Sequence, residues 1–195
     1  MRITGGAKRG RKLVSWEEEG IRPMRDFVRT ALFNILADLV PESRFLDLFC
    51  GTGSVGLEAL SRGAAECVFV DSSTGACGIV RRNLDALDLL KQGQVIKADF
   101  REGIDRLVKR GRQFDLVFVG PPYEKGLAAM TLDSLGEGLL LADGALIVTE
   151  VHKKEKLSSI HGELQLTNKR TYGDNVLWFY HFSNTIPVGK TPKDN

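Results

Sequence analysis

The stretch Asp47-Leu-Phe-Cys-Gly-Thr-Gly-Ser-Val-Gly56 decides the fold of this 195-residue chain. The apolar run at residues 44–49 has the length of a buried strand, and the residues after the glycines have helical spacing. Glycines in the pattern G-x-G-x-x-G allow a tight turn and a close approach of a ligand to the backbone. The stretch therefore predicts a strand, a glycine-rich binding loop and a helix, in that order.

Strand-like and helix-like segments alternate after this loop. Further strands are expected at 67–71, 95–98, 114–119 and 145–150, and helices near 55–62, 74–89, 101–110 and 127–135. These strands are apolar on both faces, which predicts a parallel sheet covered by helices on both sides. The last two runs, 164–172 and 176–182, are separated by Gly173-Asp174 and predict an antiparallel hairpin. The fold class is α/β, with a Rossmann-like, seven-stranded sheet.

Composition indicates one domain over residues 1–195. We expect a basic extension at 1–22, an α/β core at 23–182 that opens with a helix after Pro23, and a disordered polar tail at 183–195. No apolar run approaches the roughly 20 residues of a membrane span, and no secretory signal is present, so a cytoplasmic protein without membrane contact is expected. Three cysteines without paired spacing predict reduced thiols and no metal site.

The positive charge is concentrated at the N-terminus. Residues 1–12 contain five lysines and arginines and no acid, and glycines between them suggest an extended, adaptable backbone that suits contact with phosphates. A solvated, frayed terminus is the alternative. The candidate RNA-binding residues are Arg2, Lys8, Arg9, Arg11, Arg22 and Arg25.

The glycine loop fits two kinds of cofactor. Asp71 lies 20 residues beyond Gly51, at the end of the next strand, where a carboxylate can hold ribose hydroxyls. Asp47 disfavours a dinucleotide, because its charge would lie close to the pyrophosphate, and favours S-adenosylmethionine, which carries an ammonium and a sulfonium group. Asp99 and Phe100 end the third strand at the same edge and are candidates for adenine contact; a helix cap and a core aromatic are their alternatives.

Gly120-Pro121-Pro122-Tyr123 follows the fourth strand. Two adjacent prolines cannot continue a strand, so they predict a rigid corner beside the cofactor edge. An aromatic ring there could stack on a planar substrate such as a flipped base. A stiff loop with a partly buried tyrosine is the alternative.

These motifs together resemble the RsmD family of 16S ribosomal RNA guanine-N2 methyltransferases, over nearly the whole chain. The resemblance is carried by Arg2-Ile-Thr-Gly-Gly6, Arg9-Gly-Arg11, Arg22-Pro23, the segment 28–36, Leu46-Asp-Leu-Phe-Cys-Gly-Thr-Gly53, the segment 56–63, Phe114-Asp-Leu-Val-Phe118, Pro121-Pro-Tyr123 and Tyr172-Gly-Asp174. The N-terminal segments matter most, because other methyltransferases share the glycine loop but not that arm.

The resemblance implies methyl transfer from S-adenosylmethionine to the exocyclic amine of a guanine, in 16S rRNA or a small-subunit assembly intermediate. We also expect the protein to be a monomer. The resemblance implies that the loop with Asp47, Gly51 and Gly53 holds the methionine part, Asp71 the ribose and Asp99 the adenine. Phe49 and Phe100 are further candidate cofactor contacts. In the catalytic set Gly120, Pro121, Pro122 and Tyr123, the tyrosine would stack on the base and the Pro121 carbonyl would accept a hydrogen bond from the amine.

The chain departs from the family pattern at Gly120, where the family has Asp or Asn, so one hydrogen-bond acceptor for the amine is missing. Three interpretations follow: a slow methyltransferase in which water, Glu124 or Glu150 substitutes; a protein that binds cofactor and RNA without methylating; or an enzyme for another substrate. A second departure is Met24, where family members usually have Thr.

Overall fold

The computed structural model describes residues 1–15, 24, 26–123 and 125–183. The expectations for Arg22, Pro23, Arg25, Glu124 and the tail from 184 therefore lie outside the described residues. The helices are α1 (Asp26–Ile35), α2 (Ser54–Ser61), α3 (Thr74–Ala86), α4 (Phe100–Val108) and α5 (Leu127–Leu135), and the strands are β1 (Arg44–Leu48), β2 (Glu66–Asp71), β3 (Gly93–Lys97), β4 (Phe114–Val119), β5 (Leu141–His152), β6 (Ile160–His161), β7 (Leu164–Tyr172) and β8 (Asn175–Phe182).

The strands form one sheet in the order β3-β2-β1-β4-β5-β8-β7-β6. Strands β1 to β5 pair in parallel, and β8 runs antiparallel to both β5 and β7, as the sequence predicts. The expected count of seven strands is corrected to eight, because the two-residue β6 pairs with β7 at the edge. Strand β5 is also longer than expected, because its ladder with β8 continues to the pair His152 and Asn175.

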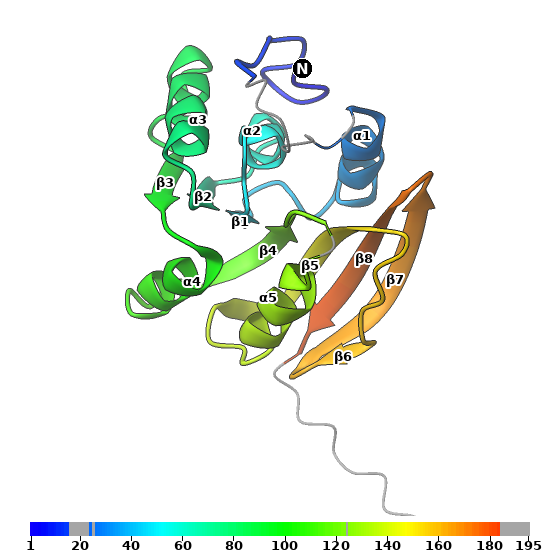
Figure 1. The fold of residues 1–195 in the computed structure, drawn as a ribbon. Coiled ribbons are helices and arrows are strands. Elements are labelled where there is room, and N and C mark those ends of the chain that lie inside the picture. The colour runs from blue at the N-terminus through cyan, green and yellow to red at the C-terminus, as the bar shows by residue number, and fades with distance from the viewer. Residues whose placement is uncertain (16–23, 25, 124, 184–195) are drawn as a thin grey trace, which may run out of the picture.

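Helices cover both faces of the sheet, with α1, α2 and α3 on one face and α4 and α5 on the other (Figure 1). Successive side chains of a strand point to opposite faces, so a strand covered on both sides is apolar at most positions, and Asp47 is the buried exception in β1. In β1, Phe45 packs with the α1–α3 side, whereas Leu46 and Leu48 pack with the α4–α5 side. The chain leaves β1 toward β2 and later returns to β4 on the other side of β1, which opens a crevice at the carboxyl ends of these two strands.

The basic N-terminus is a folded hairpin, which corrects the expected adaptable arm. The amide of Ile3 donates to the Arg11 carbonyl at 3.0 Å, and the amide of Gly10 donates to the Ile3 carbonyl at 2.9 Å. Ile3 and Leu13 are buried in the core that includes α1 and α2. Each side of the hairpin thus contributes one apolar anchor, which is the reason this glycine-rich segment has a defined structure.

A buried carboxylate ties this hairpin to the core. Glu58 of α2 is fully buried and accepts hydrogen bonds from the Thr4 amide, the Thr4 hydroxyl and Arg62 Nε, each at 2.8 Å. Arg29 of α1, also fully buried, places its Nε 3.4 Å from the same carboxylate. Removing one partner of a buried ion pair leaves an uncompensated charge, which is far more costly than losing an exposed pair.

We expect the Glu58→Gln variant to lower the free energy of unfolding by about 3 kcal/mol, because the buried Arg29 guanidinium then keeps only the exposed carboxylate of Asp26, at 3.1 Å, as a counter-charge. Glu102→Gln is the matched control, since Glu102 pairs with Arg106 on the exposed surface of α4 and should cost at most about 0.5 kcal/mol. Urea denaturation measures both values. Equal, small losses in the two variants would contradict the role given to Glu58.

Candidate functional site

A cavity of about 90 Å³ lies at the carboxyl ends of β1 and β4. It brings together the glycine loop, the residue that follows β4 and a glutamate of β5, and its lining residues are Met24, Asp47, Phe49, Cys50, Gly51, Thr52, Ser54, Val55, Phe118, Gly120 and Glu150. The position agrees with the rule that ligands of open parallel sheets bind outside the carboxyl ends of the strands.

The loop after β1 has a sharply turned backbone. Phe49, Gly51 and Gly53 have φ angles of +61°, +52° and +76°, in the left-handed region that favours glycine. A side chain at Gly53 would also collide with Val80, whose Cγ2 would lie 2.9 Å from the added Cβ. The sequence motif therefore folds as predicted, with glycine required both for the turn and for packing against α3.

Two acidic residues hold the loop through its backbone amides. Asp47 accepts from the Gly56 amide at 2.9 Å, and Asp71 accepts from the amides of Gly51 and Ser73 at 2.9 and 2.8 Å. Asp71 thus has a structural task in shaping the loop. Its contact with ribose stays a prediction.

Asp47 is a buried acid with an unusual titration. Burial in the apolar core raises its pKa to about 7, with a smaller contribution in the same direction from the neighbouring Asp71, and the Gly56 amide opposes the shift. An ionised Asp47 would be stabilised by a positive group in the cavity and not by a pyrophosphate. The acidic lining of the cavity therefore fits the ammonium end of S-adenosylmethionine better than the pyrophosphate of a dinucleotide.

The predicted adenine contacts lie beside this loop. The rings of Phe49 and Phe100 are tilted against each other with centroids 5.5 Å apart. Asp99 caps α4 by accepting from the Glu102 amide at 3.0 Å, and Phe100 is only 5% exposed. Asp99 is thus a helix cap and Phe100 a buried aromatic residue, as the two alternatives from the sequence state. Contact of either residue with the cofactor stays a prediction.

The tetrapeptide at residues 120–123 begins inside the site and then leaves it. The Gly120 amide donates to the Leu48 carbonyl at 3.2 Å, which places Gly120 directly beside the glycine loop. Pro121 is buried and Pro122 is exposed. Tyr123 is half-buried, with its ring centroid 6.0 Å from that of His152. Among the four predicted catalytic residues, only Gly120 lines the described cavity.

Sequence reasoning missed two parts of the site. Met24 lines the cavity, although the sequence showed it only as a departure from a family pattern. Asn83 of α3 is buried; its side chain accepts from the Val14 amide at 2.8 Å and donates to the Val14 and Thr52 carbonyls at 3.1 and 3.3 Å. It therefore connects the N-terminal segment to the glycine loop, and no sequence motif marks it.

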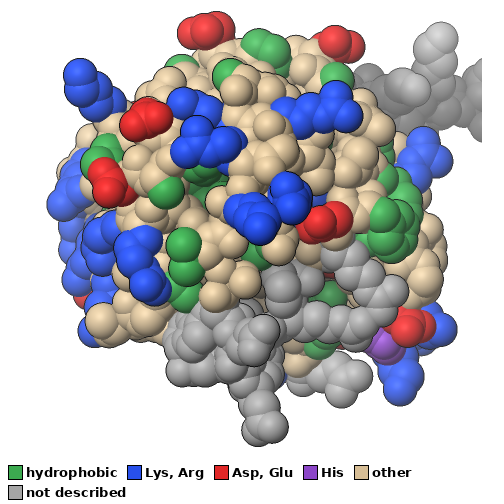
Figure 2. Space-filling view, turned by 90° about the horizontal axis from the view of Figure 1, so that it is seen from above, with side chains coloured by type: hydrophobic (Ala, Val, Ile, Leu, Met, Phe, Trp, Pro, Cys, Tyr) green, Lys and Arg blue, Asp and Glu red, His purple; other side chains and the backbone are tan. Residues whose placement is uncertain are grey.

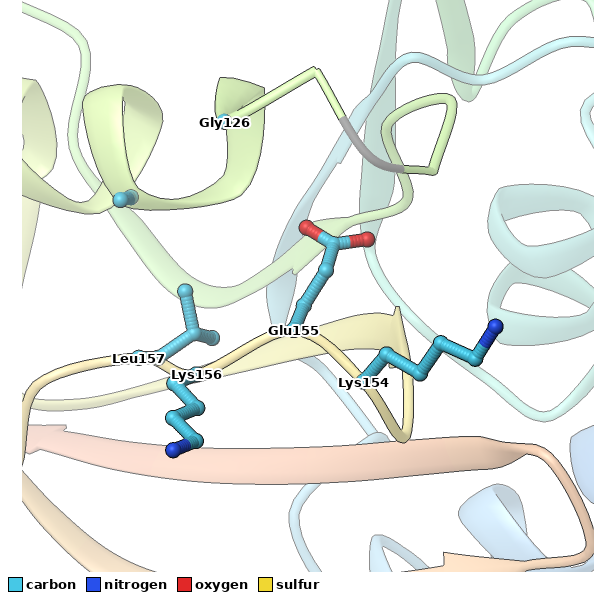
Figure 3. A pocket seen from close by; sticks show the side chains of 6 residues that line it. Gly126, Lys154, Glu155, Lys156 and Leu157 are labelled. Atoms are coloured by element: carbon cyan, nitrogen blue, oxygen red, sulfur yellow. The ribbon is translucent and has the colours of Figure 1, made fainter.

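A larger hollow, of about 490 Å³, lies between the N-terminus of α5 and residues 154–157 (Figure 3). Its lining mixes charges, with Lys154, Lys156 and Glu155, and Figure 3 shows the two lysine side chains directed away from each other. No residue of the glycine loop lines it. We therefore place the candidate cofactor site in the smaller cavity, where the buried acid and the turned loop meet.

The predicted RNA-binding residues of the hairpin differ in the contacts that their side chains make with the rest of the protein. Arg11 donates to the Ala86 carbonyl, Lys8 lies 3.8 Å from the Asp88 carboxylate, and Arg2 donates to the Gly10 carbonyl at 3.4 Å. Arg9 is exposed, and its side chain forms no hydrogen bond or ion pair with another described residue. On the face that carries the hairpin, lysine and arginine side chains are widely spread, with acidic side chains between them (Figure 2).

Within the described ranges, no helix is long and apolar enough to cross a membrane. No group of three or more His, Cys, Asp or Glu residues in this part of the chain is arranged to hold a metal ion. Burial raises the pKa of the Cys50 thiol well above its usual value, so this lining residue stays protonated at neutral pH.

Comparison with known proteins adds a family and several relatives. Residues 1–181 match the family model described as "Conserved hypothetical protein 95". The chain is 34% identical to the ribosomal RNA small subunit methyltransferase D of Escherichia coli, over 92% of this chain and 89% of that protein. The structure of a hypothetical protein of Thermus thermophilus superposes with a TM-score of 0.79 at 32% identity, covering 92% of this chain and 98% of that one.

An RNA methyltransferase of Salinibacter ruber, solved in complex with S-adenosyl-L-homocysteine, shares the fold at 16% identity, with a TM-score of 0.66 over 86% of this chain and 98% of that one. This likeness supports the architecture of the sheet and its helices. The expected α/β, mostly parallel fold with a C-terminal antiparallel hairpin is thereby confirmed.

We expect the Asp47→Asn variant without cofactor to be more stable than the unaltered protein at pH 8 and equally stable near pH 3.5. Because the folded protein raises the pKa of Asp47, folding is favoured while this side chain is protonated. This contribution to the free energy of unfolding is fully present below about pH 4 and is lost as the pH rises toward 7. Thermal melts across this range measure the difference. The exposed Asp85→Asn variant is the control, and a gain for Asp47→Asn that does not vary with pH would contradict the assignment.

Proposed function

The chain belongs to the conserved hypothetical protein 95 family, the RsmD family, and on that premise we propose that it methylates the exocyclic N2 of a guanine in 16S ribosomal RNA. The observation that carries the proposal is the cavity that joins the glycine loop to Gly120 and Glu150. The name of the Escherichia coli relative, a small-subunit rRNA methyltransferase, supports rRNA as the substrate.

The cofactor of this family is S-adenosylmethionine, which supplies an electrophilic methyl group on a sulfonium. A cavity of about 90 Å³ is smaller than the pockets of roughly 300 Å³ or more that enclose ligands of drug size. It can therefore hold only the methionine end. Asp47, Phe49 and Gly51 line this cavity, and Gly53 belongs to the same loop. Asp71, Asp99 and Phe100 follow along the same sheet edge for the ribose and adenine.

The base is held on the other side of the cavity. The aromatic ring of Tyr123 stacks on the flipped guanine, and the Pro121 carbonyl accepts an N–H bond from its amine. The amine lone pair is delocalised into the ring, so hydrogen-bond acceptors that rotate the amine out of plane make it a better nucleophile. Bound S-adenosylmethionine would supply the methyl carbon to which N2 bonds; the electron pair of the broken carbon–sulfur bond would stay on sulfur, and N2 would release one proton.

The RNA is 16S rRNA, free or in a small-subunit assembly intermediate, and it is held by the hairpin with Arg2, Lys8, Arg9 and Arg11, together with Arg22 and Arg25 outside the described residues. Because the hairpin is folded and anchored by Glu58, its backbone holds these cations on a preformed surface. A preformed surface loses less conformational entropy on binding than a mobile arm. The protein is proposed to act as a monomer in the cytoplasm.

A second candidate function follows from Gly120. Without an acceptor at this position, the chain could bind the cofactor and RNA and leave the amine unactivated. Loss of one hydrogen-bonding group in a preorganised site costs about 10²–10³ in rate. An aspartate at 120 also requires an adjustment, because its Cβ would lie 2.8 Å from Cε1 of Phe118.

The deciding experiment uses radiolabelled S-adenosylmethionine with under-methylated small ribosomal subunits, followed by nucleoside analysis of the digested rRNA. We expect N2-methylguanosine from the unaltered chain. Label only with the Gly120→Asp variant would establish the non-methylating alternative. No label with either protein, when cofactor binding is confirmed by calorimetry, would contradict the proposed substrate.

We expect Arg9→Gln to weaken RNA binding and to reduce the slope of log K against log salt by about 0.7–0.9, the value for one lost phosphate contact. Arg110→Gln is the matched control, because Arg110 is also exposed but follows α4, on the opposite face of the sheet from the hairpin (Figure 1). Filter binding at several salt concentrations measures both slopes. Identical slopes in the two variants would exclude Arg9 from the RNA interface.

A further inference from the structure

Glu150 lies beside Gly120 because of the register between β4 and β5. Val119 of β4 pairs with Thr149 of β5, and the Thr149 hydroxyl donates to the Val119 carbonyl at 2.9 Å. Gly120 follows Val119 at the end of β4, and Glu150 follows Thr149 in β5. The backbones at these two residues are therefore expected to lie about 4.8 Å apart, the spacing of neighbouring strands. Residues in register point to the same face of a sheet, so the Glu150 side chain lies on the face where a side chain at 120 would project.

The lining of the cavity confirms this placement. Gly120 and Glu150 both line it, together with Asp47 and the turned loop. Glu150 is only 6% exposed, which is unusual for a glutamate. A buried carboxylate facing a cavity of this size must be matched by hydrogen-bond donors, from the protein or from a ligand.

Asn175 fixes the orientation of this carboxylate. The Asn175 amide, at the start of β8, donates to Glu150 Oε1 at 2.6 Å. A carboxylate has two oxygens and about four lone-pair positions, so it can accept hydrogen bonds from several donors at once. The antiparallel end of the sheet thus reaches the site through the side chain of Asn175.

We propose that Glu150, oriented by Asn175, accepts the hydrogen bond from the guanine N2 amine that the side chain missing at position 120 would otherwise accept. The inference rests on the proposed function and names the group that makes the site competent despite Gly120. A glutamate has one methylene more than an aspartate, which suits an acceptor reaching across from the neighbouring strand. The proton released by N2 passes to this carboxylate and then to solvent.

Glu150→Gln is the sharpest variant, because the expected change is one of polarity and not of volume. The amide oxygen of the new glutamine should face the Asn175 donor, so its NH₂ group faces the substrate amine and two donors oppose each other. We expect kcat to fall by about 100-fold, with the affinity for S-adenosylhomocysteine within about two-fold of the unaltered protein. Glu163→Gln, an exposed carboxylate before β7, is the matched control and should change neither value.

A binding measurement without turnover separates substrate contact from a structural role. In the presence of S-adenosylhomocysteine, NMR titrations compare guanosine monophosphate with inosine monophosphate, which lacks the 2-amino group. The unaltered protein should prefer the guanine nucleotide, and Glu150→Gln should lose that preference. The double variant with Gly120→Asp and Glu150→Gln should have a kcat at least about tenfold higher than Glu150→Gln alone, since it returns a carboxylate to the same face.

A second variant keeps the test decisive if Glu150→Gln folds poorly. Asn175→Ala leaves the glutamate in place without its orienting donor and should lower kcat about tenfold and weaken the preference for guanine. Unchanged kcat and unchanged nucleotide preference in a folded Glu150→Gln protein would overturn the inference while leaving the proposed function intact. Absence of N2-methylguanosine from the unaltered chain, with cofactor bound, would overturn the proposed function and this inference with it.

Discussion

The parallel pairing of β1 with β4 is the constraint on which the candidate site depends. It places Leu48 and Val119 in register, so the loops that follow these strands start side by side and are joined by the bond from the Gly120 amide to the Leu48 carbonyl. Because β2 and β5 extend the sheet in opposite directions, no crossover fills the space above this pair. The glycine loop and Gly120, far apart in the sequence, therefore line one cavity.

Three buried acids around this framework show how similar side chains acquire different tasks. Glu58 is surrounded by Thr4, Arg29 and Arg62, so its charge is compensated within the fold and serves to hold the hairpin. Asp47 accepts one backbone hydrogen bond and faces the cavity, and its raised pKa shows that burial is not balanced by a cation. Glu150 has an amide partner and also faces the cavity. The first is a structural acid, and the other two are suited to meet positive or N–H groups of ligands.

The sequence predicts the local features of this protein well, since they depend on neighbouring residues. The glycine loop, the alternation of strands and helices and the C-terminal hairpin follow from periodicity and turn residues, and most strand positions agree within a few residues. The hairpin at the N-terminus was not predicted, because its glycines and cations resemble a mobile arm, and its anchors Ile3 and Leu13 are single apolar residues in a polar segment. The role of Glu58 could not be predicted either, as its partners come from three separate segments. The position of Glu150 beside Gly120 depends on strand register, which local patterns do not give.

We propose that the buried carboxylate of Asp47 meets the charged end of the cofactor in the cavity between β1 and β4. Carbon-13 NMR titration of the Asp47 carboxyl group, with and without S-adenosylhomocysteine, tests it directly, because this product keeps the ammonium group of the cofactor. We expect a pKa of about 7 for Asp47 in the free protein and a clear decrease of this pKa in the complex, since a nearby cation favours the ionised acid. A pKa that is unchanged by saturating S-adenosylhomocysteine would contradict the placement of the cofactor and the chemistry built on it.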